Sequence, residues 1–269
     1  QYGLTAKSAI LIEASTGRVI FEKNADAREY PASMTKMMTA ILSLEMAKPD
    51  DIVHVSNEAA NVEGSSLYLE KGDAISMSEL CQGMMLISGN DAAVAIADAV
   101  SGNTTDFVKL MNKKAAEIGA VNTHFANPSG LPNPDHYSTA RDMAKIADYC
   151  YQNESFRKIV STKEKEVQWI TPDKKVMLYN TNHLLWSYPY ADGIKTGYTD
   201  DAGGCLTASA KHDGVTLIAV VMHTDSEPDK FSEAKQLLNY GFQKVHMQAA
   251  YSKADLTKAI HIHDGKVPE

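Results

Sequence analysis

The amino-acid sequence predicts an α/β (α+β) fold built on one antiparallel five-stranded sheet that is covered by helices. Three observations lead to this prediction: two strand-like runs near the N-terminus, three near the C-terminus, and a middle section, residues 77–152, with apolar residues at helical spacing. Strands from both ends can share one sheet only if the terminal segments meet in space. A chain of 269 residues with 44% apolar residues can bury a core of that size.

The N-terminal part is expected to form two strands followed by a helix. The strands are predicted at Ser8–Glu13 and Arg18–Lys23. Pro31 then precedes residues 34–46, a run with apolar residues three and four positions apart and without Gly or Pro. Ser33 therefore belongs to the first turn of a helix.

The C-terminal part is expected to form three strands and a closing helix. Residues 205–210 and 215–223 are strand-like runs, and the His-Asp-Gly sequence between them is a strong hairpin signal. The third strand begins near Gly193, and the closing helix is predicted over residues 229–242.

Ser33 and Lys36 form a Ser-x-x-Lys motif at the start of the N-terminal helix. The spacing places both side chains on one helix face, so the amine can reach the hydroxyl. Free N–H groups and the positive end of the helix dipole favour negative charge that develops beside Ser33. Alone, such a motif is more often a capping serine and a solvated lysine, so its meaning depends on other motifs.

Two further motifs supply that context. Ser88-Gly89-Asn90 lies between two apolar helical runs and is expected to be a short loop that directs its side chains into a cleft. Lys195-Thr196-Gly197 is expected on an edge strand, where the backbone can pair with an extended peptide and glycine permits close approach. The alternative for this third motif is an exposed edge strand with a protective lysine.

The chain also contains copies of these motifs in other settings. Ser155 and Ser232 each begin another Ser-x-x-Lys, and Ser101-Gly102-Asn103 repeats the second motif. Ser101 ends one helix just before the N-cap of the next, so we expect it to be structural. The order of the motifs along the chain selects Ser33, Ser88 and Lys195.

In this order, the three motifs resemble those of the penicillin-interacting serine enzymes. The chain is similar to the low-molecular-mass penicillin-binding proteins, specifically the serine D-alanyl-D-alanine carboxypeptidases of the S11 peptidase type. The resemblance extends from about Ala6 to Phe242 and implies a β-lactamase/transpeptidase-like fold. It also implies a penicillin-binding catalytic domain over residues 1–245, with an all-helical subdomain inserted at about residues 50–155. Other stretches that look like landmarks of the family are residues 15–19, 30–39, 90–93, 127–131, 139–142, 180–182 and 193–199.

The expected chemistry starts at Ser33, which must lose its proton as it attacks. No histidine stands near it in a recognisable motif, so the expected base is Lys36. Its amine must be neutral, which burial and the cation of Lys195 would favour. Ser88 is expected to relay the proton to the leaving amine, and Asn90 to hold the substrate's peptide carbonyl or to position Lys36.

The resemblance implies that Lys195 and Thr196 hold the terminal carboxylate of the substrate. It also implies an oxyanion hole made by the backbone N–H groups of Ser33 and Tyr198, the residue after Gly197. Members of the family often have histidine where this chain has Tyr198, so side-chain contacts with substrate are expected to differ. Lys230 is a candidate for a further cation, with a solvated helix residue as the alternative.

The implied activity is removal of the terminal D-alanine from peptidoglycan stem pentapeptides through an acyl-enzyme, with β-lactam antibiotics as covalent inhibitors. One alternative is a serine β-lactamase, but the Glu-x-x-Leu-Asn loop of the common class is absent, and Glu164 and Glu166 lie in a lysine-rich stretch. The other is a catalytically inactive peptidoglycan-binding scaffold, which the intact motifs argue against.

Composition excludes several other classes. A net charge of −8 without a basic block argues against nucleic acid or anionic lipid as a partner. No apolar run of about 18 residues or more is present, so membrane attachment is expected only through a C-terminal anchor outside this chain. We expect an exported protein at the extracytoplasmic face of the bacterial cell membrane or in the cell wall, whose signal peptide is not present in this chain.

No metal or cofactor is expected. The three cysteines, Cys81, Cys150 and Cys205, lack metal-ligand spacing and are expected to be buried free thiols. Residues 246–269 are expected to be a linker that could begin a truncated C-terminal β domain. His261 and His263 alternate there on a short strand and are expected at the surface rather than as metal ligands.

Overall fold

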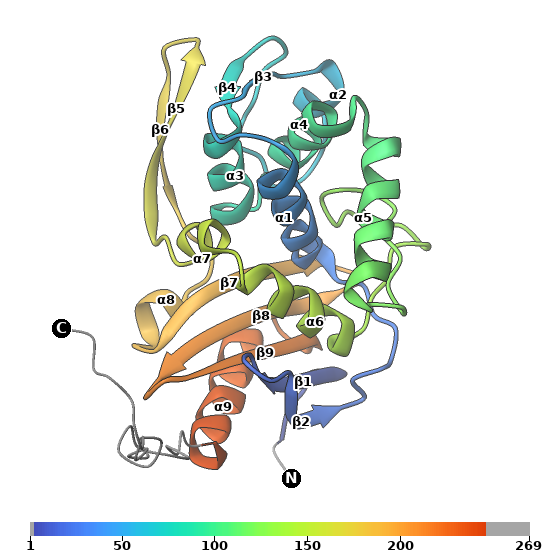
Figure 1. Ribbon diagram of the computed structural model, residues 1–269, viewed down its shortest axis with the longest axis vertical. Helices are drawn as coiled ribbons and strands as arrows, with labels where there is room; N and C mark the ends of the chain where they lie inside the picture. The colour runs from blue at the N-terminus through green and yellow to red at the C-terminus, as the bar shows by residue number, and fades with distance from the viewer. Residues whose placement is uncertain (1–2, 246–269) are drawn as a thin grey trace, which may run out of the picture.

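A five-stranded antiparallel sheet forms the centre of the computed structural model (Figure 1), which describes residues 3–245. The strand order is β2-β1-β9-β8-β7, so the N-terminal strands pair with the last one and both ends of the domain meet in one sheet. The predicted fold class is confirmed. The strands are β1 (Ser8–Glu13), β2 (Arg18–Lys23), β7 (Ala191–Thr199), β8 (Gly203–His212) and β9 (Val215–Thr224).

The details of this sheet follow the sequence closely. The first two strands have the predicted bounds. Between β8 and β9, Asp213 and Gly214 have φ values of 46° and 77°, and two consecutive positive φ angles are what a two-residue type I′ hairpin requires. Within the described residues β7 pairs only with β8, so the motif from Lys195 to Gly197 lies on an edge strand as predicted.

Helices cover both faces of the sheet. On one face, α9 (Asp229–Lys244) packs against β8 and β9. On the other, α6 (Ala140–Tyr151) packs against β1 and β9, and the 3-10 helix η1 (Ala32–Thr35) packs against β7 and β8. The remaining helices are α1 (Lys36–Met46), α2 (Asn57–Ala60), α3 (Met77–Leu86), α4 (Asn90–Ser101), α5 (Thr104–Ile118), α7 (Glu154–Val160) and α8 (Leu184–Ser187).

Side-chain alternation along the strands separates two hydrophobic cores. Ile10 and Ile218 belong to the core on the side of α6, whereas their neighbours Leu11 and Leu217 belong to the core under α9. Successive residues of a strand point to opposite faces, so a continuous apolar run fills both cores. The predicted helix start near Ser33 is also confirmed, although its first turn is a 3-10 turn that continues into α1.

A second, four-stranded sheet lies beside the helices, and the sequence does not predict it. Its order is β3-β4-β5-β6, and two of its strands fall within residues 50–155, so the subdomain expected to be all-helical also contains strands. A three-residue strand is too short for a period of two to be recognised, which explains why the two strands within residues 50–155 are not predicted. The strands are β3 (Ile52–His54), β4 (Ala74–Ser76), β5 (Glu164–Thr171) and β6 (Lys175–Tyr179).

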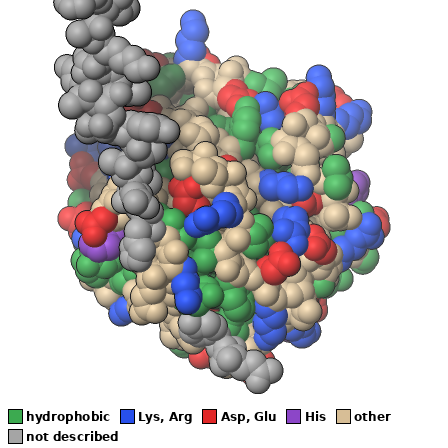
Figure 2. Space-filling view, turned by 60° about the horizontal axis from the view of Figure 1, so that its bottom comes forward, with side chains coloured by type: hydrophobic (Ala, Val, Ile, Leu, Met, Phe, Trp, Pro, Cys, Tyr) green, Lys and Arg blue, Asp and Glu red, His purple; other side chains and the backbone are tan. Residues whose placement is uncertain are grey.

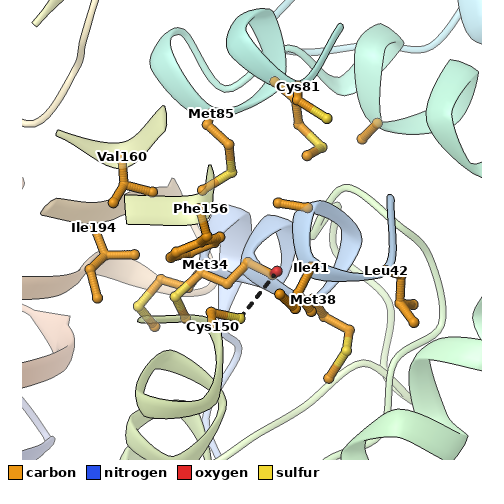
Figure 3. Packing of buried hydrophobic residues seen from close by; sticks show 14 of the residues in the cluster. Met34, Met38, Ile41, Leu42, Cys81, Met85, Cys150, Phe156, Val160 and Ile194 are labelled. Atoms are coloured by element: carbon orange, nitrogen blue, oxygen red, sulfur yellow. Dashed lines mark hydrogen bonds between the residues drawn. The ribbon is translucent and has the colours of Figure 1, made fainter. Parts of the chain in front are cut away.

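The larger core fixes the N-terminal helix against the edge strand. Met34 packs near Phe156 of α7 and Ile194 of β7 (Figure 3), and all three side chains are buried. The thiol of Cys150 donates a hydrogen bond to the carbonyl oxygen of Met37 at 3.6 Å. Because α1 and β7 share this core, the distance between the first and third motifs is set by packing.

Surface charges of both signs and buried thiols characterise the described part of the chain. On the face in Figure 2, positive and negative side chains are interspersed. All three cysteines are free and buried, as predicted. Among residues 3–245, no helix is long and apolar enough to cross a membrane, and no group of three or more acidic, histidine or cysteine side chains could hold a metal ion. The predicted linker, with His261 and His263, lies outside the described residues.

Candidate active site

The three sequence motifs meet where η1 and α1 contact the edge of the sheet. Ser33 lies in η1 and is half-buried, and Lys36 begins α1. Ser88 lies in the turn between α3 and α4, and Asn90 is the first residue of α4. Hydrogen bonds from Lys36 to Asn90 and from Lys195 to Ser88 join the motifs into one site.

Lys36 is held at the centre of the site by three polar atoms. Its Nζ lies 2.9 Å from Ser33 Oγ, and it donates to Asn90 Oδ1 and to the backbone carbonyl of Ser129, both at 2.7 Å. A neutral amine has two N–H groups and one lone pair. Since the two carbonyl oxygens accept the two N–H groups, the lone pair is left for the Ser33 hydroxyl. This geometry suits proton removal from Ser33.

The electrostatic environment favours the neutral form of Lys36. The side chain is 0% exposed. Burial lowers its pKa well below the ordinary lysine value, the Lys195 cation lowers it further, and the Asp91 carboxylate opposes the shift. Asp91 also accepts hydrogen bonds from the backbone N–H groups of Leu67 and Leu69, which spread its charge over other partners.

The turn of the second motif is strained at Ser88 and anchored at Asn90. Ser88 has a φ of 65°, which is unfavourable for a residue with a side chain and is often found at functional sites. The Asn90 amide nitrogen donates to the carbonyl of Glu63, and its backbone N–H donates to the carbonyl of Ser65, both at 2.7 Å. Its Oδ1 therefore faces Lys36, so of the two expected roles the structure shows the contact with Lys36.

Lys195 forms a second buried cation in the site. It is 1% exposed, and its Nζ donates to Ser88 Oγ at 3.1 Å and to the Thr196 carbonyl at 3.0 Å. Burial and the nearby Lys230 cation lower its pKa to about 7. Lys230 is itself 2% exposed and pairs with Glu227 at 2.8 Å. Lys230 is therefore a buried neighbour of the site, and the alternative of a solvated helix residue is excluded.

The rest of the third motif brings the backbone of β7 beside the nucleophile. A Cβ atom at Gly197 would lie 3.2 Å from both Pro31 O and Ser33 N, so glycine permits this close packing. The Thr196 hydroxyl lies 2.7 Å from that of Thr181. The Tyr198 side chain is 49% exposed, and its hydroxyl bonds to Asp200 at 3.3 Å.

A loop that the sequence marked only as a family landmark completes the site. Besides the Ser129 carbonyl that binds Lys36, it supplies Gly130, which has a φ of 92° and lies against the backbone of Ala32. Asn127 Oδ1 accepts the backbone N–H of Gly130 at 2.7 Å and so shapes the turn. The turn composition of residues 127–131 was visible in the sequence, but its contact with Lys36 depends on folding.

His136, which the sequence did not single out, stabilises the turn that carries Ser33 through a hydrogen bond to Thr35. Its Nδ1 accepts the backbone N–H of Ala126 at 3.0 Å, so its Nε2–H donates to Thr35 Oγ1 at 2.7 Å. Burial, with smaller contributions from His124 and Lys36, lowers the pKa of His136 to about 4. It is therefore a neutral buried support rather than a base for Ser33.

The structure separates the motif copies from the site. Ser155 and Ser232 are exposed on α7 and α9, and Lys158 pairs with Glu154 instead of a serine. Ser101 ends α4 and bonds to the Ala97 carbonyl. Glu164 and Glu166 are exposed residues of β5 in the second sheet.

Comparisons with known proteins agree with one another. The sequence model of the S11 peptidase family, described as D-alanyl-D-alanine carboxypeptidase, matches residues 1–226. The D-alanyl-D-alanine carboxypeptidase DacF of Bacillus subtilis is 42% identical over 266 residues, covering 97% of this chain and 68% of its own length. DacA of Escherichia coli is 39% identical over 252 residues, covering 89% of this chain and 61% of its own length.

A structural relative is matched over nearly its whole length. The crystal structure of the Streptomyces K15 DD-transpeptidase has a TM-score of 0.86 and 33% sequence identity, and the match covers 90% of this chain and 99% of that one. The present chain therefore spans about two thirds of the Bacillus and Escherichia relatives and nearly all of the Streptomyces structure.

Proposed function

The chain belongs to the D-alanyl-D-alanine carboxypeptidase family of S11 serine peptidases, and on that basis we propose that it removes the terminal D-alanine from peptidoglycan stem peptides. One observation carries the proposal: the fully buried Nζ of Lys36 lies 2.9 Å from Ser33 Oγ. Its two N–H groups are held by carbonyl oxygens, so its lone pair is available to a serine that must be deprotonated.

Acylation begins when Ser33 Oγ attacks the carbonyl carbon between the two D-alanines and its proton passes to Lys36. The backbone N–H groups of Ser33 and Tyr198 stabilise the negative oxygen of the tetrahedral intermediate, and losing one such donor typically costs about 2.7–4 kcal/mol in the barrier. The C–N bond then breaks, and Ser88 relays to the nitrogen of the departing D-alanine the proton that Lys36 took from Ser33, so Lys36 and Ser88 both return to their neutral starting forms. The remaining stem peptide is left as an ester on Ser33, which water hydrolyses.

The substrate carboxylate is proposed to bind at Lys195 and Thr196. Lys195 is buried and close to Lys230, so an approaching carboxylate meets positive charge in a poorly solvated place. A carboxylate also stabilises the protonated form of Lys195, which its surroundings alone disfavour. Substrate binding and Lys195 protonation are therefore coupled.

β-Lactams are proposed to act as covalent inhibitors of the same serine. After attack on a peptide, the D-alanine leaves and water can reach the ester. After attack on a β-lactam, the amine stays tethered and blocks that water. The chain has no Glu-x-x-Leu-Asn loop to activate another water, and Glu164 and Glu166 lie on β5 of the second sheet. We therefore propose a long-lived adduct on Ser33.

The substrate also bears on where the enzyme works. Peptidoglycan stem peptides lie outside the cytoplasmic membrane, so the proposed activity belongs to the extracytoplasmic face of a bacterial cell. The family of bacterial carboxypeptidases to which the chain belongs supports this location.

Mass spectrometry after incubation with benzylpenicillin tests the proposal, together with D-alanine release from an acetylated peptide ending in D-Ala-D-Ala. We expect one adduct, mapped to Ser33, and steady D-alanine release. Ser33→Ala should lose both, whereas Ser155→Ala and Ser232→Ala serve as matched controls and should keep both. Rapid multiple-turnover penicillin hydrolysis without D-alanine release would instead support a β-lactamase, and neither adduct nor release would support an inactive scaffold.

A further inference from the structure

A cavity of about 270 Å³ lies between α1, α3 and α7, away from the catalytic serine. Ser43 and Leu44 line it from α1, Cys81 lines it from α3, and Ile159 lines it from α7. Ser43 stands seven residues after Lys36, so it lies about 10 Å further along the helix axis. The mechanism uses none of the residues that line this cavity.

The inner wall of the cavity is apolar. Met77, Cys81 and Ile159 line it and are buried. Ser43 Oγ donates to the Ala40 carbonyl at 2.7 Å and accepts the thiol of Cys81 at 3.0 Å, and Cys81 extends from α3 toward α1 (Figure 3). Burial raises the pKa of this thiol to about 11, so it is neutral near pH 7. The inner wall therefore suits a hydrocarbon group.

The exposed lining residues mark the mouth of the cavity, which is positively charged. Ser155 and Lys158 of α7 lie there, and they form one of the Ser-x-x-Lys copies that the active site does not use. Lys158 pairs with Glu154 at 2.7 Å, but the two side chains are 74% and 71% exposed, and such exposed pairs contribute little. Among the described residues that line the cavity, Lys158 is the only charged one, so the mouth favours an anionic group.

The volume limits the length of the ligand. An apolar cavity of about 150 Å³ accepts benzene, which has six carbon atoms, so 270 Å³ accommodates a chain of about ten carbon atoms. The acyl chains of membrane lipids are longer than this. A free acid of medium length therefore fits the cavity better than a lipid of the membrane surface.

We propose that this cavity binds a free medium-chain carboxylic acid, with its hydrocarbon chain against Cys81 and Ile159 and its carboxylate at Lys158. The site is separate from the catalytic one, and the proposal does not depend on the proposed function. The lining helices are α1, which carries Lys36, α3, which leads to Ser88, and α7, which packs against β7. A bound acid thus contacts the helices that position all three motifs.

A chain-length series tests the apolar part of the site. Hexanoate, octanoate, decanoate and dodecanoate are titrated into the protein by isothermal titration calorimetry. Each buried methylene should tighten binding about 4-fold, so octanoate should bind about 16-fold more tightly than hexanoate. Dodecanoate should bind no more tightly than decanoate, because the cavity is then full. No measurable binding of any acid, or affinity that keeps rising at dodecanoate, would overturn the proposal.

Variants of Cys81 place the hydrocarbon chain in the cavity. Cys81→Met should fill the inner wall and weaken decanoate binding by about 10-fold or more, whereas Cys81→Ala should enlarge the cavity and move the plateau to a longer chain. Cys150→Ala is the matched control, because Cys150 is also buried but does not line the cavity, and it should keep the wild-type profile. Wild-type profiles in both Cys81 variants would show that the acids bind elsewhere.

The head group is assigned with octanol and with two lysine variants. Octanoate should bind about 3-fold more tightly than octanol, and Lys158→Gln should remove this preference. Lys235→Gln changes the exposed lysine of the other Ser-x-x-Lys copy and should keep it. Tighter binding of octanol would instead point to Gln82, whose buried Oε1 has no hydrogen-bond partner within residues 3–245, and would overturn the carboxylate assignment.

Lys195→Met distinguishes this cavity from the active site, because it removes the buried cation that is proposed to take the substrate carboxylate. Octanoate should bind this variant as tightly as the wild type. Loss of octanoate binding in Lys195→Met would place the acid in the active site and overturn the proposal. Absence of D-alanine release by the wild type would overturn the proposed function alone and leave the cavity site in place.

Discussion

Replacing Gly130 with alanine is expected to disable the nucleophile without altering any side chain that reacts. Gly130 has a φ of 92°, and an added Cβ would lie 1.9 Å from Ala32 O, 2.3 Å from Ala32 C and 3.0 Å from Ser33 N. Non-bonded carbon contacts are favourable only at about 3.5–4.0 Å. Relief therefore requires the backbone before Ser33, or the loop that binds Lys36, to move by about 1 Å or more.

Two costs follow from this single methyl group. A non-glycine residue at positive φ lowers the free energy of unfolding by about 1–2 kcal/mol, and the clash adds to that. A misplacement of about 1 Å at a reacting group can reduce the rate about 100-fold. We therefore expect Gly130→Ala to lower the penicillin acylation rate at Ser33 by about 100-fold or more.

Gly119→Ala provides the matched control. Gly119 has a φ of 82°, but an added Cβ would meet nothing within 4 Å. This variant should show only the conformational cost, about 1–2 kcal/mol, with a wild-type acylation rate. Urea unfolding measures stability, and timed mass spectrometry with benzylpenicillin measures acylation. If Gly130→Ala acylates as fast as Gly119→Ala, the proposed packing of the loop against the nucleophile turn is refuted.

Two further predictions concern buried titratable groups. Lys36→Arg should abolish acylation because guanidinium keeps its protons near neutral pH. Lys36→Met, which removes the base without burying a charge, should abolish it too. If either variant is folded by circular dichroism and is labelled by penicillin as fast as the wild type, Lys36 is not the base. For His136, the pKa of about 4 in the folded protein lies below the ordinary value of 6.5. Between these two pH values the unfolded chain binds more protons than the folded protein does. The free energy of unfolding therefore falls by about 3 kcal/mol as the pH drops from 6.5 to 4. His136→Asn should flatten this slope in urea unfolding, and an unchanged slope would show that His136 is not its source.

Several features could be predicted because their signals are local. The Asp-Gly turn requires positive φ angles whatever surrounds it, and the apolar runs at β8 and β9 are long enough for their length and turns to be recognised. The Ser33 and Lys36 pair shares a helix face by spacing alone. By contrast, β3 and β4 are three residues each and carry no period, so they become strands only by pairing with each other and with β5.

The long-range hydrogen bonds around Lys36 and Thr35 could not be predicted from the sequence. The Ser129 carbonyl reaches Lys36 from 93 residues away, and His136 reaches Thr35 from 101 residues away. Nothing local in either segment specifies its partner. The burial of Lys230 could not be predicted from the sequence either, because only the packing of α9 decides whether that cation is solvated or buried near Lys195.

By itself, then, the sequence determined the order of the motifs, the helix that pairs Ser33 with Lys36, and the edge strand that carries Lys195. These depend on helix periodicity, strand alternation and turn chemistry, which operate over a few residues. Only the tertiary structure decided that Lys36 is fully desolvated and that Asn90 and Ser129 hold its two N–H groups. Burial and charge separation are properties of packing between distant segments, and they determine whether a lysine can act as a base.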